Sequence, residues 1–377
     1  MTTVLTGITW EHERGYGSVV ASAEAYRDVA PGVEVRWSYR SLQSFADQPL
    51  EELVEQYDLL VIDHPHIPFA AENGLFARLD GRGHDDEIAV LAGQSVGRSH
   101  ASYSHGGHQY ALATDAAAQV AAYRPDLLDS PPRTWQDVLA LAREGRVLWP
   151  YKPVDAFSSL VTVAGNAGSP ALARPGEFLP ADAAASALDI LRELASLVPA
   201  DNATWNPIQA ADALASSDRF AYCPLLFGYT NYSRAGFRAH RLRYVDIPTR
   251  GDGVGGSLLG GAGIAVSSRT RHPDLAIDFA FWLDSAEVQE GVYYDGGGQP
   301  GNSVAWESDR TNADSLDFFR GTRATLEGAY VRPREISYIE LQNELSPLVT
   351  AALTGGLTDE QLIGHLDEGA RTYLGGN

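Results

Sequence analysis

Two short stretches of this sequence carry the residue types that acid–base chemistry needs. Each follows a predicted strand, the first at residues 4–9 and the second at residues 59–62. Histidine titrates near neutral pH, and a neighbouring carboxylate orients and tunes its imidazole. The residues that could act as general acids or bases are Glu11, His12, His64 and His66. The alternative is that the first stretch is a solvated loop and that Asp63 caps the turn that follows it.

The second stretch also has the residue types of a metal site. Asp63 directly follows an unbroken aliphatic run, which is typical of a strand buried on both faces of a parallel sheet. Ligands of open α/β sheets bind beyond the carboxyl ends of the strands, so binding or catalysis is expected here. Pro65, however, restricts the geometry of the two flanking histidines, and the spacing marks no third ligand. We therefore predict no metal site.

Aromatic residues stand at several predicted loop ends and suit stacking on sugar faces or flat rings, since a rigid ring supplies contact area at a small entropic cost. They are Trp10, Trp205, Tyr229 and Tyr232, of which the first and third are the stronger candidates. The alternative is that these rings pack in the core or on the surface. The glycine-rich segment 251–263 has no following Lys-Ser/Thr and precedes a strand, so it is neither a phosphate loop nor a dinucleotide fingerprint. No cofactor is predicted.

Length and charge limit the classes of protein further. A chain of 377 residues exceeds the roughly 250–300 at which single cores stop growing, so two domains are expected. The net charge of −21 disfavours nucleic acid and anionic membranes as partners.

The location is predicted from two sequence features. No apolar run reaches transmembrane length, so no membrane insertion is expected. No secretory signal is visible, so the sequence as it stands predicts a cytoplasmic location. If the chain is a trimmed mature form, it is periplasmic or extracellular. Cys223 lies in an apolar run and is predicted to be an inert core residue.

Around these stretches, the pattern predicts alternating strands and helices. The first half reads as strands at 4–9, 33–37 and 59–62, with helices at 18–28 (Ser18 as N-cap), 50–57 and 69–79. This is the signature of a parallel sheet covered on both faces. A hairpin turn at Gly106-Gly107 accounts for the nearby histidines, and a short strand at 110–113 precedes a crossing between lobes at residues 114 and 115.

A second α/β block follows. Thr134 and Asp137 form a capping box for a helix to about residue 143. The remaining elements are predicted to be helices at 157–167, 181–197, 208–216, 275–283, 315–328, 338–354 and 358–374, and strands at 116–123, 220–227, 242–247 and 263–267.

Five segments in order resemble those of a known family. They are residues 57–80, HQYALATDAAAQVAAYRPDLL, PPRTWQDVLALA, GGAGIAVSSRTRHPDLAIDFAFWLDSAEVQ and LSPLVTAALTGGLTDEQLIGHLDEGA. The sequence is similar to the bacterial extracellular solute-binding proteins, the receptors of ABC importers, in the group that takes sugars and related polar solutes. The chain departs from the family in lacking an export signal and in gathering titratable groups at the expected binding site.

The resemblance implies an α/β fold like that of periplasmic binding proteins, with two lobes, crossover hinges and a ligand cleft that closes by hinge motion. It implies that residues 1–113 and 268–310 form lobe 1, that 114–267 form lobe 2, and that 311–377 are helices packing on the lobes. A small-molecule ligand and, if the protein is exported, an ABC permease are the implied partners. The implied ligand-binding residues are Trp10, Arg14, Asp63, Asp115, Phe157, Ser158, Trp205, Tyr229, Gly260 and Gly261.

Two functions from different classes follow. The first is a solute-binding protein that holds a small polar or aromatic-bearing molecule between its lobes without covalent chemistry. The alternative is a cytoplasmic enzyme on the same scaffold that uses its histidines and Glu11 in a condensation, cyclisation or lyase step. A cytoplasmic sensor is a third class, for which the sequence carries no marker.

Overall fold

The computed structural model describes residues 2–250 and 253–375, which divide into two compact units. The first unit comprises the chain up to Ala117 together with Gly260–Asn312, and the second comprises Ala118–Leu259 and the chain from Ala313 onward. The chain passes between the units within β6 (Ala111–Tyr123), at the start of β9 (Leu259–Val266) and within α13 (Asp309–Asp314). The boundaries implied by the resemblance were 113, 267 and 310, and the structure divides the chain after Ala117, Leu259 and Asn312. Of the described C-terminal residues, 313–375 belong to the second unit.

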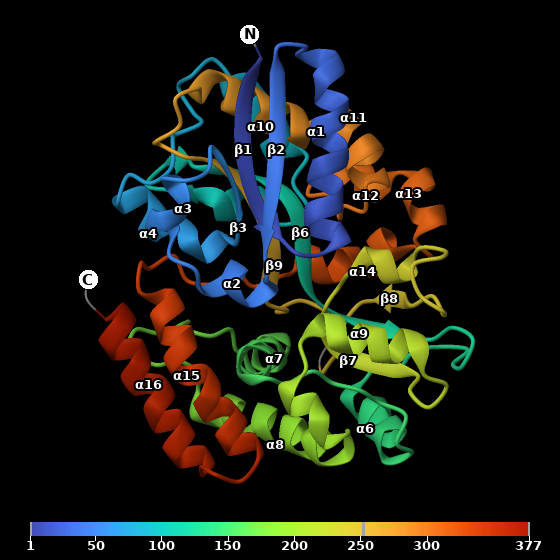
Figure 1. Ribbon diagram of the computed structural model, residues 1–377. Helices are drawn as coiled ribbons and strands as arrows, with labels where there is room; N and C mark the ends of the chain where they lie inside the picture. The colour runs from blue at the N-terminus through green and yellow to red at the C-terminus, as the bar shows by residue number, and fades with distance from the viewer. Residues whose placement is uncertain (1, 251–252, 376–377) are drawn as a thin grey trace. The chain divides into compact units, whose positions relative to one another are not determined.

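The first unit is built on a sheet whose order is β2-β1-β3-β9. The central strand β1 (Thr3–Trp10) pairs in parallel with β2 (Val33–Arg40) and β3 (Leu59–Ile62). These three parallel strands confirm the predicted series, and Figure 1 shows β1 and β2 side by side with α1 running along them. β9 runs antiparallel to β3, with Leu59 opposite Val266.

Helices cover both faces of this sheet. One face packs against α1 (Ser18–Val29) and α10 (Pro273–Asp284), where Tyr26 meets Phe279 edge-on. The other face packs against α3 and α4. The bounds of the remaining helices of this unit are α2 Leu42–Asp47, α3 Leu50–Val54, α4 Ile67–Glu72, α5 Asp85–Gly93, α11 Ala286–Val288, α12 Ser303–Glu307, two π-helices at Glu13–Gly17 and Gln289–Tyr293, and two 3-10 turns at His64–His66 and His100–Tyr103.

Three local predictions in this unit were wrong. The helix expected over 69–79 ends at Glu72, because Asn73 and Gly74 (φ +60°) turn the chain into an extended segment. Ser18 is not an N-cap, since the π-helix before it runs directly into α1 and Gly17 takes the cap position. The strands expected at 110–113 and 116–123 are one continuous strand, β6.

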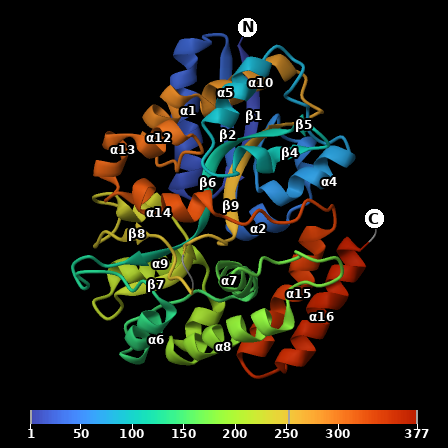
Figure 2. The same cartoon turned by 180° about the vertical axis from the view of Figure 1, so that it is seen from behind.

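The predicted hairpin is present. β4 (Ser104–His105) and β5 (His108–Gln109) pair antiparallel around Gly106 and Gly107, whose φ angles of +56° and +81° suit glycine. The hairpin lies beside α4 in Figure 2.

The second unit combines the remaining strands with a helical core. The later part of β6 pairs antiparallel with β7 (Tyr222–Phe227) and β8 (Arg243–Val245). Cys223 on β7 is fully buried, as predicted, and burial raises the pKa of its thiol. The helices are α6 Trp135–Arg143, α7 Pro153–Asn166, α8 Ala181–Leu197, α9 Pro207–Ser216, α14 Phe318–Glu327, α15 Tyr338–Leu353 and α16 Asp359–Leu374, with 3-10 turns at Ala200–Thr204 and Thr230–Ser233.

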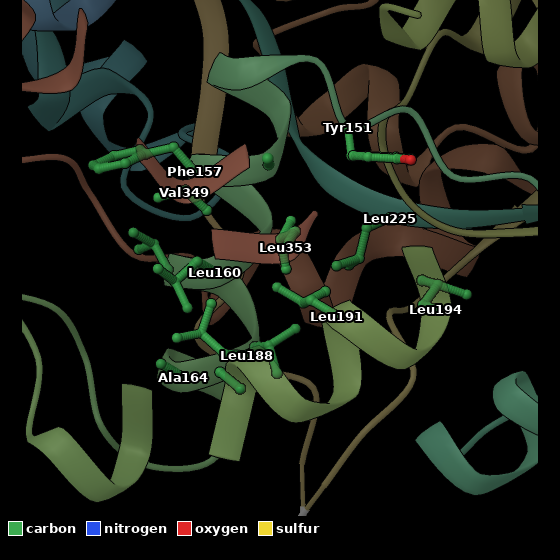
Figure 3. Packing of buried hydrophobic residues seen from close by; sticks show 14 of the residues in the cluster. Tyr151, Phe157, Leu160, Ala164, Leu188, Leu191, Leu194, Leu225, Val349 and Leu353 are labelled. Carbon is green, nitrogen blue, oxygen red and sulfur yellow. The ribbon is translucent and has the colours of Figure 1, made fainter. Parts of the chain in front are cut away.

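The core of the second unit lies where α7, α8 and α15 meet. Figure 3 shows Phe157 and Leu160 of α7, Leu188 of α8 and Leu353 of α15 converging on it. The capping box that begins α6 is present, with Thr134 Oγ1 accepting from the N–H of Asp137. α8 has the predicted bounds because its apolar residues repeat with helical spacing.

Candidate functional site

The carboxyl ends of β1, β2 and β3 meet at one edge of the sheet in the first unit, because the three strands are parallel neighbours. Trp10 ends β1 opposite Arg40, which ends β2. Asp63 directly follows β3. This edge therefore brings together the two stretches in which the sequence placed the candidate residues.

A π-helix, Glu13–Gly17, follows β1 where a loop was expected. His12 caps it, with Nδ1 accepting from the N–H of Arg14 at 3.0 Å. Ser18 Oγ donates to the carbonyl of Arg14 at 2.8 Å, which ties the turn to α1. A Cβ on Gly15 would lie 2.4 Å from the ring of Trp10, so the turn can cross this ring only with glycine. Single π turns are frequent at functional sites.

The side chain of Arg14 pairs with the carboxylate of Asp115. Nε donates to Oδ2 at 2.7 Å and Nη2 to Oδ1 at 2.5 Å, a bidentate arrangement. Both side chains are buried, exposed by 5% and 1%. Because the pair joins the turn after β1 to β6, it fixes the position of that turn against the sheet.

Asp63 belongs to the same electrostatic environment. Burial raises the pKa of Asp115, the Arg14 guanidinium lowers it in part, and the charge of Asp63 raises it further. The structure thus places Arg14, Asp63 and Asp115 in one region of the first unit.

Asp63 caps the 3-10 turn that follows β3, as the alternative interpretation had it. Its Oδ1 accepts from the N–H of His64 at 2.8 Å, and Nδ1 of His64 lies 3.2 Å from the same oxygen. The side chain of His64 is fully buried with its ring edge-on to Tyr103, whereas that of Asp63 is 24% exposed. His66 is partly buried at the end of the turn.

The aromatic residues at this edge differ from those expected. Trp10 is only 4% exposed, and its ring packs against Phe45 with centroids 5.2 Å apart. Tyr16 and Tyr39 form an edge-to-face pair with centroids 4.9 Å apart, and Tyr39 is 51% exposed. Sequence reasoning missed Tyr39 and Arg40 because it ended the second strand at residue 37, whereas β2 continues to Arg40.

Gly260 and Gly261 lie in β9, and Gly261 allows a close approach of two backbones. Gly261 has φ +106°, and a Cβ there would lie 2.5 Å from the carbonyl oxygen of Asp115. Gly261 therefore allows β9 to lie against the segment of β6 that carries Asp115.

The four candidates in the second unit have different environments. Phe157 is fully buried in the core, 5.5 Å from Phe178 between ring centroids. Ser158 Oγ donates to the carbonyl of Val154 within α7. Tyr229 is 6% exposed before the turn Thr230–Ser233, and Trp205 is partly buried after the turn Ala200–Thr204. The structure gives the first two of these residues roles in the core and in the helix.

The proposed acid–base residues mostly have structural partners. The imidazole of His12 caps the π-helix and that of His64 is buried beside Asp63, while Glu11 is exposed. Within residues 2–250 and 253–375, no three His, Cys, Asp or Glu side chains are placed to share a metal ion. This geometry does not favour general acid–base catalysis.

Comparison with known proteins assigns the family. The sequence model of one family, the bacterial extracellular solute-binding proteins, matches residues 23–318, well over half of the chain. The protein belongs to this family. Its members bind small solutes and work with ABC transporters. In the part of the chain that the structure describes, no helix has the length and apolar character needed to cross a bilayer.

Solved structures share the fold over nearly the whole chain. Maltose-bound MalE3 from T. maritima superposes with a TM-score of 0.85 at 17% identity, covering 99% of this chain and 100% of that one. A solute-binding protein from Thermotoga lettingae bound to α-D-tagatose gives 0.82 at 17% identity, covering 99% and 100%. One from Agrobacterium radiobacter with ribitol gives 0.79 at 19% identity, covering 98% of each chain. The fold is therefore the α/β fold of periplasmic binding proteins, as predicted.

Proposed function

We propose that this protein binds a small polyhydroxylated solute, a sugar or a polyol, and releases it chemically unchanged. Family membership supports capture of a small solute. The proteins of the same fold named above are bound to maltose, tagatose and ribitol, which are all polyhydroxylated molecules.

The observation that carries this proposal is the setting of the Asp63 carboxylate. It lies at the carboxyl end of a parallel strand, it is held by the N–H of His64, and it remains 24% exposed. Carboxylates accept hydrogen bonds from hydroxyl groups, and a carboxylate fixed beforehand loses little entropy on binding. Asp63 is thus a preorganised acceptor for solute hydroxyls.

An aromatic pair at the same edge, in which Tyr39 is exposed and Tyr16 is partly buried, supplies the apolar contact. Tyr39 and Tyr16 meet edge-to-face, which holds both rings in place. A sugar has an apolar face of C–H groups that packs on such rings. Trp10, buried beneath the π-helix turn at Gly15, supports the site from within.

Contributions from Tyr229 and Trp205, and a position of the solute between two lobes, stay predictions of the family resemblance. The family is one of extracellular proteins, and of the two locations left open by the sequence it favours the exported one. We propose an ABC permease as the partner on the same ground.

Native mass spectrometry of the purified protein tests the proposal. We expect a copurifying or added sugar or polyol to bind with one molecule per chain and to be recovered with its mass unchanged. Such binding raises Tm by mass action. A solute recovered with altered mass would establish the enzyme instead, and a protein that binds no sugar or polyol from a broad panel would refute the proposal.

A further inference from the structure

Arg40, the last residue of β2, is a buried cation with an incomplete set of partners. Arg40 is only 8% exposed. Its Nη1 donates to the carbonyl of Ser44 at 3.2 Å, and its Cζ lies 5.4 Å from the centre of the Phe45 ring. A guanidinium has five N–H donors in a planar fork. Nε and Nη2 are fully buried and have no hydrogen-bond partner in the described part of the chain.

The charge of Arg40 is not balanced within the described residues. Among the side chains that the structure describes, no carboxylate forms an ion pair with this guanidinium, and the titratable group that acts on it is Tyr57. Burial lowers the pKa of Arg40 to about 10, and the charge of Tyr57 opposes this shift. The side chain is therefore still protonated at neutral pH. A buried charge without a partner is costly, and proteins normally pair such a group with an ion of opposite charge.

Trp10 adds a donor to the same place. Trp10 and Arg40 are opposite residues of neighbouring parallel strands, so their side chains leave the sheet on the same face. Both contact Phe45, the indole at 5.2 Å between ring centroids and the guanidinium at 5.4 Å. The indole Nε1 is likewise buried without a hydrogen-bond partner in the described residues. Two neighbouring side chains thus present three buried donor atoms and one positive charge.

We infer that Arg40 and Trp10 bind an oxyanion, and that this anion is the carboxylate of an acidic sugar. The inference rests on the proposed function, because Trp10 ends the strand that leads into the proposed solute site. An oxyanion supplies what the donors lack: two or more acceptor oxygens for the planar fork and a negative charge for the guanidinium. A neutral sugar would leave the charge of Arg40 unbalanced.

Two sources share this chemistry, an acidic sugar and a free inorganic anion, and calorimetry distinguishes them. The probes are D-galacturonate, D-galactose and inorganic sulfate, each titrated into the wild-type chain at constant ionic strength. We expect galacturonate to bind at least about tenfold more tightly than galactose, since hydrogen bonds to charged groups are the strong ones. Sulfate binding that equals or exceeds galacturonate binding would assign the site to a free anion and overturn the sugar-acid inference.

The variant Arg40→Gln tests the site itself, with Arg36→Gln as the matched control. Arg36 lies on the same strand but is 63% exposed and paired with Glu34. We expect Arg40→Gln to weaken galacturonate binding about tenfold or more, to weaken galactose binding by a much smaller factor, and to raise Tm without anion because the unbalanced charge is gone. Arg36→Gln should do none of these.

Trp10→Phe keeps the test decisive if Arg40→Gln fails to fold. It retains a ring and removes the indole N–H, so galacturonate binding should weaken by a larger factor than galactose binding. Equal effects of Arg40→Gln and Arg36→Gln on galacturonate, or a galacturonate affinity no greater than that for galactose, would overturn the inference. Either result would leave the proposed function intact if galactose still binds. A wild-type chain that binds neither sugar nor polyol would refute the proposed function.

Discussion

The guanidinium of Arg14 holds the carboxylate of Asp115 through two hydrogen bonds of 2.7 and 2.5 Å, across 101 residues of sequence. Both groups are buried, and an isolated charge is costly in the low dielectric of the interior. Each group therefore neutralises the charge of the other. The pair ties the turn after β1 to β6 and so positions the edge at which Asp63 is found.

Breaking this pair should be costly. Arg14→Met leaves Asp115 buried and uncompensated, and we expect the free energy of unfolding to fall by about 3–5 kcal/mol. Urea denaturation measures the change. The double variant Arg14→Met/Asp115→Asn should recover part of the loss because neither charge remains. A single variant as stable as the wild type would show that the pair does not stabilise the fold.

Asp284 should make stability depend on pH. Burial raises its pKa to about 7 from an ordinary 3.8, opposed by the hydrogen bond that Thr114 Oγ1 donates to it at 2.7 Å. Since the folded-state pKa is raised, the stabilising contribution is complete below the unfolded pKa and is lost as pH rises through the folded one. Between about pH 4 and pH 7, the wild type should lose unfolding free energy relative to Asp284→Asn by up to about 1.4 kcal/mol per pH unit.

Denaturation curves of both proteins at several pH values measure this difference. Asparagine can still accept the hydrogen bond from Thr114, so the substitution removes the titration and keeps the contact. Parallel pH profiles for the two proteins would exclude Asp284 as the titrating group.

Gly261 should not tolerate a side chain. Its φ of +106° and the 2.5 Å approach of a Cβ to the carbonyl of Asp115 both oppose alanine. We expect Gly261→Ala to destabilise the fold by more than about 1 kcal/mol. Gly32→Ala is the control, since a Cβ there meets nothing within 4 Å. Thermal denaturation measures the Tm of each variant. Equal Tm values for Gly261→Ala and Gly32→Ala would show that Gly261 tolerates a side chain.

The core of the second unit should respond to loss of volume. Leu160 of α7 is fully buried among the side chains shown in Figure 3. Leu160→Ala should lower the free energy of unfolding by about 2–5 kcal/mol, through lost burial and the cavity left behind. Leu197, partly buried at the end of α8, is the control and should lose less on the same substitution. Equal losses would mean that the core around Leu160 collapses around the gap.

Local patterns predicted much of the fold. The aliphatic run Leu59–Ile62 is β3, the periodic segment 181–197 is α8, and Thr134 forms the predicted capping box of α6. These elements depend on neighbours within a few residues. The helix expected over 69–79 failed because one Asn-Gly pair outweighed the helical spacing after it.

The site was predictable only in part. The sequence placed Asp63 at the end of a strand, which the structure confirms. It identified Arg14 and Asp115 only through resemblance, because no local signal links residues 101 positions apart. It missed Arg40 because it ended the second strand at residue 37, and because the burial of this side chain depends on its packing against Phe45 of α2.

Calorimetric titration of a sugar or polyol into the wild-type chain and into Asp63→Asn measures whether the Asp63 carboxylate binds the solute. Asparagine can still cap the turn by accepting from the N–H of His64, so folding should be preserved while the charged acceptor is lost. We expect the wild type to bind one solute molecule per chain and Asp63→Asn to bind it about tenfold or more weakly. Asp86→Asn, an exposed change on α5, should have no effect. An unchanged Kd in Asp63→Asn would contradict the account.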